Sequence, residues 1–121
     1  MKKVFILFFF LVTHLAVGQG NYEEVISNAI LNYDSTKIDS LAKSIGYKGG
    51  EQVETLVRFK VNHEGKTVDV TAEGPHEIFI NESIKIIENL PKLDFGITIE
   101  EGKTLSLKLP INFSIKLDSE Q

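Results

Sequence analysis

The chain has 121 residues, of which 42% are apolar and 25% charged, and it contains no Cys and three His. This length fits one domain of ordinary globular composition. The absence of Cys excludes disulfides, a thiol nucleophile and a thiolate zinc site, and three His argue against a multi-histidine metal centre. The composition therefore favours a binding or interaction module over an enzyme.

Residues 1–18 are predicted to be a signal peptide. Lys2 and Lys3 precede a nearly continuous apolar run, residues 4–17, and small residues near its end favour cleavage before Gln19. As a helix, this run would cover roughly 21 Å, whereas a retained membrane anchor must cross roughly 30 Å of hydrocarbon. No Cys follows the run, so a lipoprotein anchor is excluded. We therefore expect a mature chain from Gln19 in the periplasm or secreted.

The mature chain is expected to be acidic. Residues 1–18 carry two of the 13 basic residues and none of the 17 acidic ones, so cleavage leaves 11 against 17 and a formal charge of −6. An acidic domain without a cluster of Lys and Arg repels phosphate groups, which argues against nucleic acid as a ligand. The same charge argues against anionic lipid, and we expect no stable membrane insertion of the mature chain.

Residues 19–50 are predicted to form an N-terminal helical segment. Asn21 and Glu24 have the spacing of a capping box. Apolar residues then recur at intervals of three and four, with an interruption at residues 34–35. Residues 22–45 are therefore either two short helices or one kinked helix, ended by Gly46 as a left-handed C-cap.

Residues 51–121 are predicted to form a sheet-containing unit. Apolar and polar residues alternate over residues 53–61 and again over residues 67–73, which predicts two strands of a hairpin. The turn between them contains Gly65, which is suited to a positive φ. In the returning strand, the apolar positions that we expect on one face are Val68, Val70 and Ala72.

A helix is predicted to follow the hairpin and to cover the sheet. Its apolar stripe has helical spacing, and Pro91 ends the helix. The stripe comprises Ile80, Ile84 and Ile87 and is widened by Phe79, Ile86 and Leu90. With a last strand after this helix, the order of elements predicts an α+β two-layer sandwich. In that fold a three-stranded antiparallel sheet packs against helices.

The last predicted strand has the most regular pattern in the chain. Seven apolar residues occupy every second position from residue 105 to residue 117, which predicts one apolar and one solvated face. Pro110 has no N–H to donate, so this strand is expected at a sheet edge. An unpaired edge accepts an extended peptide as an additional strand. Lys108 and Lys116 also protect edges from pairing, so docking and mere edge protection both remain open.

Metal and catalytic sites have weaker support in the sequence. His63 lies in the hairpin turn and His76 lies before the second predicted helix, each followed by a Glu. They would form a metal site only if the two loops met, and metal sites usually need three or four ligands. No Ser lies in a G-x-S-x-G elbow. We therefore predict no enzymatic activity, no metal and no cofactor.

Four motifs in the second unit occur together in a fixed order. Residues 57–66 match V-x-F-x-V-x-x-x-G-K, the predicted helix ends in Leu-Pro-Lys at residues 90–92, a Gly-Lys turn lies at residues 102–103, and residues 109–113 read Leu-Pro-Ile-Asn-Phe. Together they resemble the C-terminal domain of TonB energy transducers, in the form common among Bacteroidetes. The resemblance covers about residues 51–117. It implies a three-stranded antiparallel sheet packed under helices.

The resemblance also implies a role for the last strand. TonB domains bind the short TonB box of an outer-membrane transporter by strand addition at this element. Carried over to this sequence, the peptide-binding edge strand comprises Leu105, Ser106, Leu107, Lys108, Leu109, Pro110, Ile111, Asn112 and Phe113.

The sequence departs from the family in its N-terminal part. TonB proteins resemble tethers, with a membrane helix and a long Pro-rich spacer, and neither pattern is found here. We therefore expect an exported protein–protein interaction module that binds an extended peptide or a transporter segment. One alternative is an energy transducer held by an uncleaved leader. Another is a structural or self-associating protein, such as a homodimer paired through its edge strands.

Overall fold

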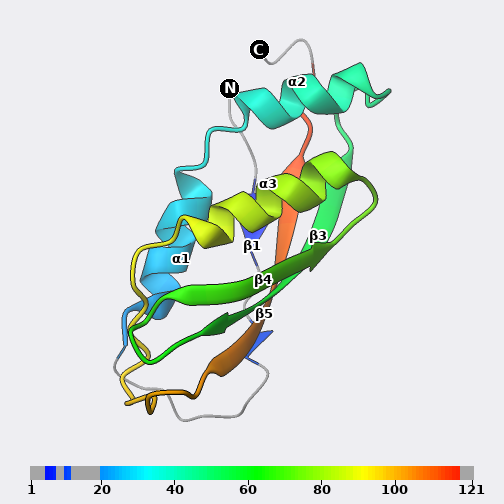
Figure 1. The fold of residues 1–121 in the computed structure, drawn as a ribbon. Coiled ribbons are helices and arrows are strands. Elements are labelled where there is room, and N and C mark those ends of the chain that lie inside the picture. Colours follow the sequence, from blue (N-terminus) through cyan, green and yellow to red (C-terminus); the bar gives the residue numbers. More distant parts are fainter. Residues whose placement is uncertain (1–4, 8–9, 12–19, 118–121) are drawn as a thin grey trace.

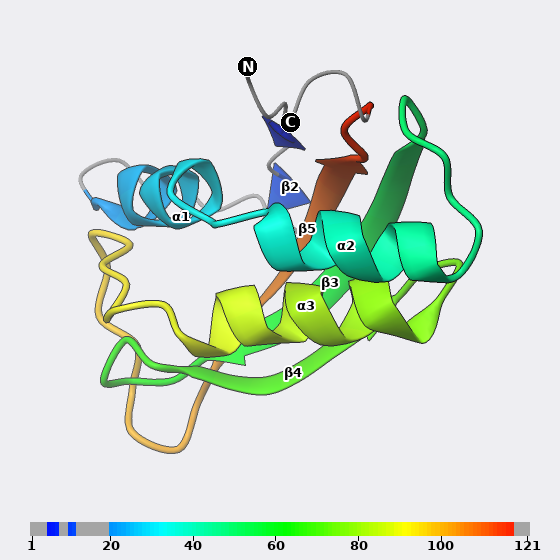
Figure 2. The ribbon, with the colours of Figure 1, turned by 90° about the horizontal axis from the view of Figure 1, so that it is seen from above.

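The computed structural model describes residues 5–7, 10–11 and 20–117. In chain order, the elements within these residues are β1 (Phe5–Leu7), β2 (Phe10–Leu11), α1 (Tyr22–Leu31), α2 (Thr36–Ser44), β3 (Gln52–Val61), β4 (Thr67–Glu73), α3 (Glu77–Glu88) and β5 (Leu105–Ser114). The long strands form an antiparallel sheet in the order β5-β3-β4, with the helices on one face (Figure 1, Figure 2). The predicted α+β two-layer sandwich is confirmed.

The alternation in β3 follows the two faces of the sheet. Its apolar residues are buried under the helices, whereas Arg58 and Lys60 are exposed on the opposite face, which we call the solvent face. α3 packs against β3 and β4, α2 packs beside α3, and α1 lies beside β1. One hydrophobic cluster spans Tyr22 to Ile115, so the N-terminal helices and the sheet share a single core.

The pattern of β4 differs from the prediction because the strand contains a β-bulge. The register between β3 and β4 shifts after Arg58, and Asp69 takes a left-handed φ of 53°. Val68 pairs with Lys60 and therefore lies on the solvent face, because directly opposite residues share a face. The bulge also brings the Asp69 carboxylate within 3.9 Å of the Lys60 ammonium. The extra residue of a bulge interrupts strict alternation, which explains why the pattern misplaced Val68.

The N-terminal segment forms two helices rather than one kinked helix, and the predicted capping box is absent. Asn21 is the N-cap of α1 but makes no side-chain cap hydrogen bond. Its side-chain oxygen instead accepts a hydrogen bond of 3.2 Å from the backbone N–H of Asp94. Tyr22 stacks on Phe95 with ring centroids 4.4 Å apart. The start of α1 is therefore fixed by contact with the loop after α3, a tertiary interaction that local spacing cannot predict.

The buried face of α3 matches the predicted stripe in part. Phe79, Ile86 and Ile87 are buried as expected, but Ile80 and Ile84 are only partly buried. The buried side chains of this helix are Phe79, Glu82, Ser83, Ile86 and Ile87. The three apolar members of this face were predicted, whereas Glu82 and Ser83 are polar and an apolar stripe cannot identify them.

Gly65 occupies the hairpin turn with a φ of 82°, as predicted. A Cβ atom at this position would lie 2.6 Å from the carbonyl oxygen of Leu93, and the Leu93 N–H donates to the Gly65 carbonyl over 2.8 Å. The turn therefore needs glycine both for its backbone conformation and for the close approach of the loop after α3.

Candidate functional site at the outer edge of β5

β5 is paired with β3 along its whole length. The register runs without a shift from Gln52↔Ser114 to Val61↔Leu105. The odd-numbered residues from Leu105 to Ile115 are buried on the helix-covered face, and Ser106 and Lys108 are exposed on the solvent face. The side of β5 that faces away from β3 is called the outer edge below.

The backbone groups that point to the outer edge follow from the hydrogen bonds at the end of the strand. The Ile115 N–H donates to the Glu51 carbonyl over 2.9 Å, and the Ile115 carbonyl accepts from the Gly50 N–H over 2.7 Å. In an antiparallel strand, both groups of one residue point to the same side, and the side alternates along the strand. Odd-numbered residues of β5 therefore bond toward β3. Even-numbered residues direct their N–H and C=O groups to the outer edge.

Pro110 belongs to the even-numbered set, so its missing N–H falls on the outer edge and leaves the ladder with β3 intact. This agrees with the rule that a strand proline directs its nitrogen away from the neighbouring strand. The outer edge consequently offers both donor and acceptor at Ser106, Lys108, Asn112 and Ser114, but only an acceptor at Pro110.

This edge was expected to be unpaired, and that expectation is wrong for the described chain, because β1 and β2 lie along it. β1 pairs antiparallel with β5 at Phe5↔Phe113, and β2 does so at Phe10↔Lys108. Phe5 and Phe10 are five residues apart, as are Phe113 and Lys108, so both pieces share one register. An open row of N–H and C=O groups is a template for any extended segment within reach, which is the physical reason for this pairing.

The described pairing along the outer edge covers Ile111–Phe113 and Leu107–Lys108. The residues opposite Leu109 and Pro110 lie outside the described residues. β1 and β2 belong to the segment predicted to be a signal peptide, whose other residues and cleavage site before Gln19 lie outside the described residues. The edge is thus open only in a chain from which β1 and β2 have been removed or displaced.

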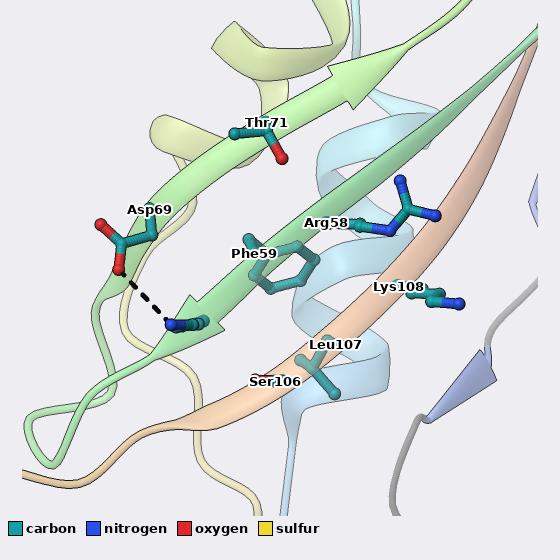
Figure 3. Close-up of a pocket in the computed structure, with 8 residues that line it drawn as sticks. Arg58, Phe59, Asp69, Thr71, Ser106, Leu107 and Lys108 are labelled. Atoms are coloured by element: carbon teal, nitrogen blue, oxygen red, sulfur yellow. Dashed lines mark ion pairs between the residues drawn. The ribbon is translucent and has the colours of Figure 1, made fainter.

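The solvent face beside this edge carries three cationic side chains around a hollow of about 400 Å³ (Figure 3). Arg58 forms an ion pair with Glu73, and Lys60 forms one with Asp69. Lys108 lies directly opposite Arg58 across the β3–β5 pair. Within the described part of the chain, no carboxylate forms an ion pair with Lys108.

His63 and His76 do not meet. His63 lies in the turn between β3 and β4, and His76 lies at the other end of β4, where it is the N-cap of α3. The His76 Nδ1 accepts a hydrogen bond of 3.2 Å from the Ile78 N–H. Among the described residues, no group of three or more His, Asp or Glu is arranged to hold a metal ion.

Two buried acids were not singled out from the sequence. The Tyr33 hydroxyl donates to Glu82 over 2.6 Å, and the ammonium groups of Lys37 and Lys85 lie 3.7 and 3.4 Å from the same carboxylate. Burial, together with the Glu82 carboxylate, raises the pKa of Tyr33. Asp39 accepts a bond of 3.3 Å from the Lys116 N–H. Both acids are held by partners from other elements, so they tie the helices to the fold.

The described residues define a small α+β domain in which the short strands β1 and β2 pair along the outer edge of β5. Comparison of the chain with protein-family models, curated proteins and solved structures found no significant match. In the described ranges, no helix is long and apolar enough to cross a membrane.

Proposed function

We propose that this chain is an exported protein–protein interaction module that binds an extended peptide by strand addition at the outer edge of β5. The peptide is either free or a segment of a larger protein, such as an outer-membrane transporter. The observation that carries the proposal is the antiparallel pairing, in one register, of β1 with Ile111–Phe113 and of β2 with Leu107–Lys108. It supports the idea that this edge accommodates a short extended segment.

In this proposal, cleavage before Gln19 removes β1 and β2 and makes the edge available in the periplasm or outside the cell. Every residue of the described core lies between Tyr22 and Ile115, so the cleaved chain keeps that core. The domain needs no cofactor and performs no catalysis. The resemblance of the sequence to TonB C-terminal domains also supports β5 as the strand that binds the peptide.

The backbone of the edge supplies part of the affinity. A ligand residue opposite Asn112 or Lys108 both donates and accepts a hydrogen bond, whereas one opposite Pro110 only donates. Each such bond contributes a net of about 0.5–1.5 kcal/mol, and association itself opposes binding by several kcal/mol. Main-chain bonds to this short edge therefore give only weak binding, and contacts of ligand side chains must provide the rest.

The test uses the chain from Gln19 and a fluorescent nine-residue peptide of alternating Val and Thr, with a Val opposite Phe113 and a Thr opposite Lys108. Because the Ser106 N–H points outward, Ser106→Pro should weaken binding by about 2- to 12-fold. Ser106→Ala, which keeps the N–H, is the matched control and should bind as the unmodified chain does. Fluorescence anisotropy gives the dissociation constants.

N-methylated peptides test the register of the same complex. A methyl group on the peptide nitrogen opposite Lys108 should abolish binding, because that N–H points at β5. A methyl group on the nitrogen opposite Leu109 should be tolerated, since that N–H points away. Equal effects of the two methyl groups would contradict strand addition at this edge. A concentration-dependent mass without peptide binding would instead favour the self-associating alternative.

A further inference from the structure

We infer that the peptide taken up at the outer edge of β5 carries an Asp or Glu at the position opposite Lys108. This inference rests on the proposed function and names the class of ligand. The ligand is antiparallel to β5, apolar at every second residue, and acidic at one defined solvent-facing position.

On the solvent face, acidic residues of β4 lie beside basic residues of β3, but β5 places a further basic residue beside β3. Between β4 and β3, each cation has an acid: Glu73 pairs with Arg58, and Asp69 pairs with Lys60. Between β3 and β5, two cations face each other, because Arg58 and Lys108 are directly opposite. Like charges in that relation are destabilising, and opposite charges in it are stabilising.

The place for the missing acid is the next strand outward. Lys108 is exposed, and in Figure 3 its side chain extends from β5 away from β3. The residue of an added strand that pairs with Lys108 lies on the same solvent face and within reach of the ammonium group. An acid there would face Lys108 directly, and no described residue of the chain already does so.

The leader of this chain does not supply that charge. The position opposite Lys108 is occupied by Phe10, an apolar residue. β2 therefore satisfies the backbone groups of the edge but leaves the lysine without a carboxylate, so an acidic ligand makes one interaction that the leader cannot make.

The alternation of the ligand follows from the other face. Leu107, Leu109, Ile111 and Phe113 are buried under the helices. Ligand residues directly opposite them share that face, where α1 lies beside the position of β1. Apolar ligand residues at these positions extend the existing core, whereas polar ones would be desolvated without partners.

The experiment compares three fluorescent nine-residue peptides on the chain from Gln19. They share the Val/Thr framework above and differ only opposite Lys108, where they carry Thr, Glu or Lys. The Glu peptide should bind about fivefold more tightly than the Lys peptide at low salt. The difference should shrink when about 0.5 M NaCl is added, because salt screens exposed charges.

Charge reversal provides the decisive control. Lys108→Glu should invert the order, so that the Lys peptide binds more tightly than the Glu peptide. Lys92→Glu makes the same change of net charge in the exposed loop after α3, and it should leave the order unchanged. Inversion by both variants would assign the effect to net charge and overturn the inference.

The two levels of the proposal fail in different ways. Equal binding of the Glu and Lys peptides to the unmodified chain, with normal binding of the Thr peptide, would overturn the acidic preference and leave strand addition standing. Failure of all three peptides to bind a chain that is folded by circular dichroism would overturn the proposed function itself.

Discussion

Proline substitutions at adjacent positions of β5 should have very different effects on stability. The Ser106 N–H points to the outer edge, so Ser106→Pro removes no hydrogen bond from the sheet of the chain that begins at Gln19. Compared with Ser106→Ala, it should lower the free energy of unfolding by less than about 1 kcal/mol. The existing Pro110 is tolerated for the same reason.

Leu107 differs because its N–H points toward β3, where it pairs with Phe59. Its side chain is only 4% exposed, so Leu107→Ala should lower the free energy of unfolding by about 2–5 kcal/mol. Leu107→Pro should lower the free energy of unfolding by about 1–3 kcal/mol more than Leu107→Ala does, because a buried carbonyl of β3 loses its donor. At each position, the difference in unfolding free energy between the Pro and Ala variants measures the contribution of the backbone N–H.

Urea denaturation followed by far-ultraviolet circular dichroism measures all four variants, and the slopes of the transitions show whether the unfolded states are comparable. If the Pro-minus-Ala difference at Ser106 equals the difference at Leu107, the alternation inferred from Ile115 is wrong. The outer edge would then lack the donors on which strand addition depends.

Three further outcomes are expected. The chain with its leader should bind the Val/Thr peptide at least about tenfold more weakly than the chain from Gln19, because a tethered segment competes at millimolar effective concentration; equal anisotropy titrations would refute this. Hydrogen bonds from the Lys48 N–H, and then from the Gly49 N–H, lower the pKa of Glu51 in the folded chain. The Glu51 carboxylate therefore stabilises the fold at a pH above its pKa in the unfolded chain. This stabilisation is lost as the pH falls through its pKa in the folded chain. Glu51→Gln should therefore destabilise the chain at pH 7 and make no difference near pH 2 in denaturant titrations. Glu82→Leu should cost about 1–3 kcal/mol, since it leaves the Tyr33 hydroxyl without its acceptor, whereas thermal melting should show a smaller loss for Glu82→Gln.

The sequence predicted those strands in which one face is buried and the other is exposed, because apolar and polar residues then alternate along the strand. The alternation in β3 and β5 was sufficient, because half of each strand must point into the core. Pro110 predicted a sheet edge, but β1 and β2 pair with β5 there, and the missing N–H lies on the side of β5 that does not bond to β3. The alternation within a strand depends on that strand alone, so it can be read from the spacing of residues in the sequence.

Other features depend on partners distant in the sequence. Asn21 bonds to Asp94 rather than to its own helix, and Glu82 is buried because Tyr33 and two lysines surround it. The pairing of β1 and β2 with β5 was also missed, because a uniformly apolar run has no period that indicates a strand. The position of Lys108 opposite Arg58 required the register of β3 and β5, which the sequence alone does not give.

Pro110 divides the row of donors on the outer edge into two short stretches. A brief extended segment can pair on both sides of the proline and lose only one bond. A growing stack of identical chains needs an unbroken row at every layer, and each chain would repeat the same defect. In a chain from which β1 and β2 have been removed, the residue that would limit the affinity for a peptide would therefore also disfavour fibril growth from this edge of the sheet.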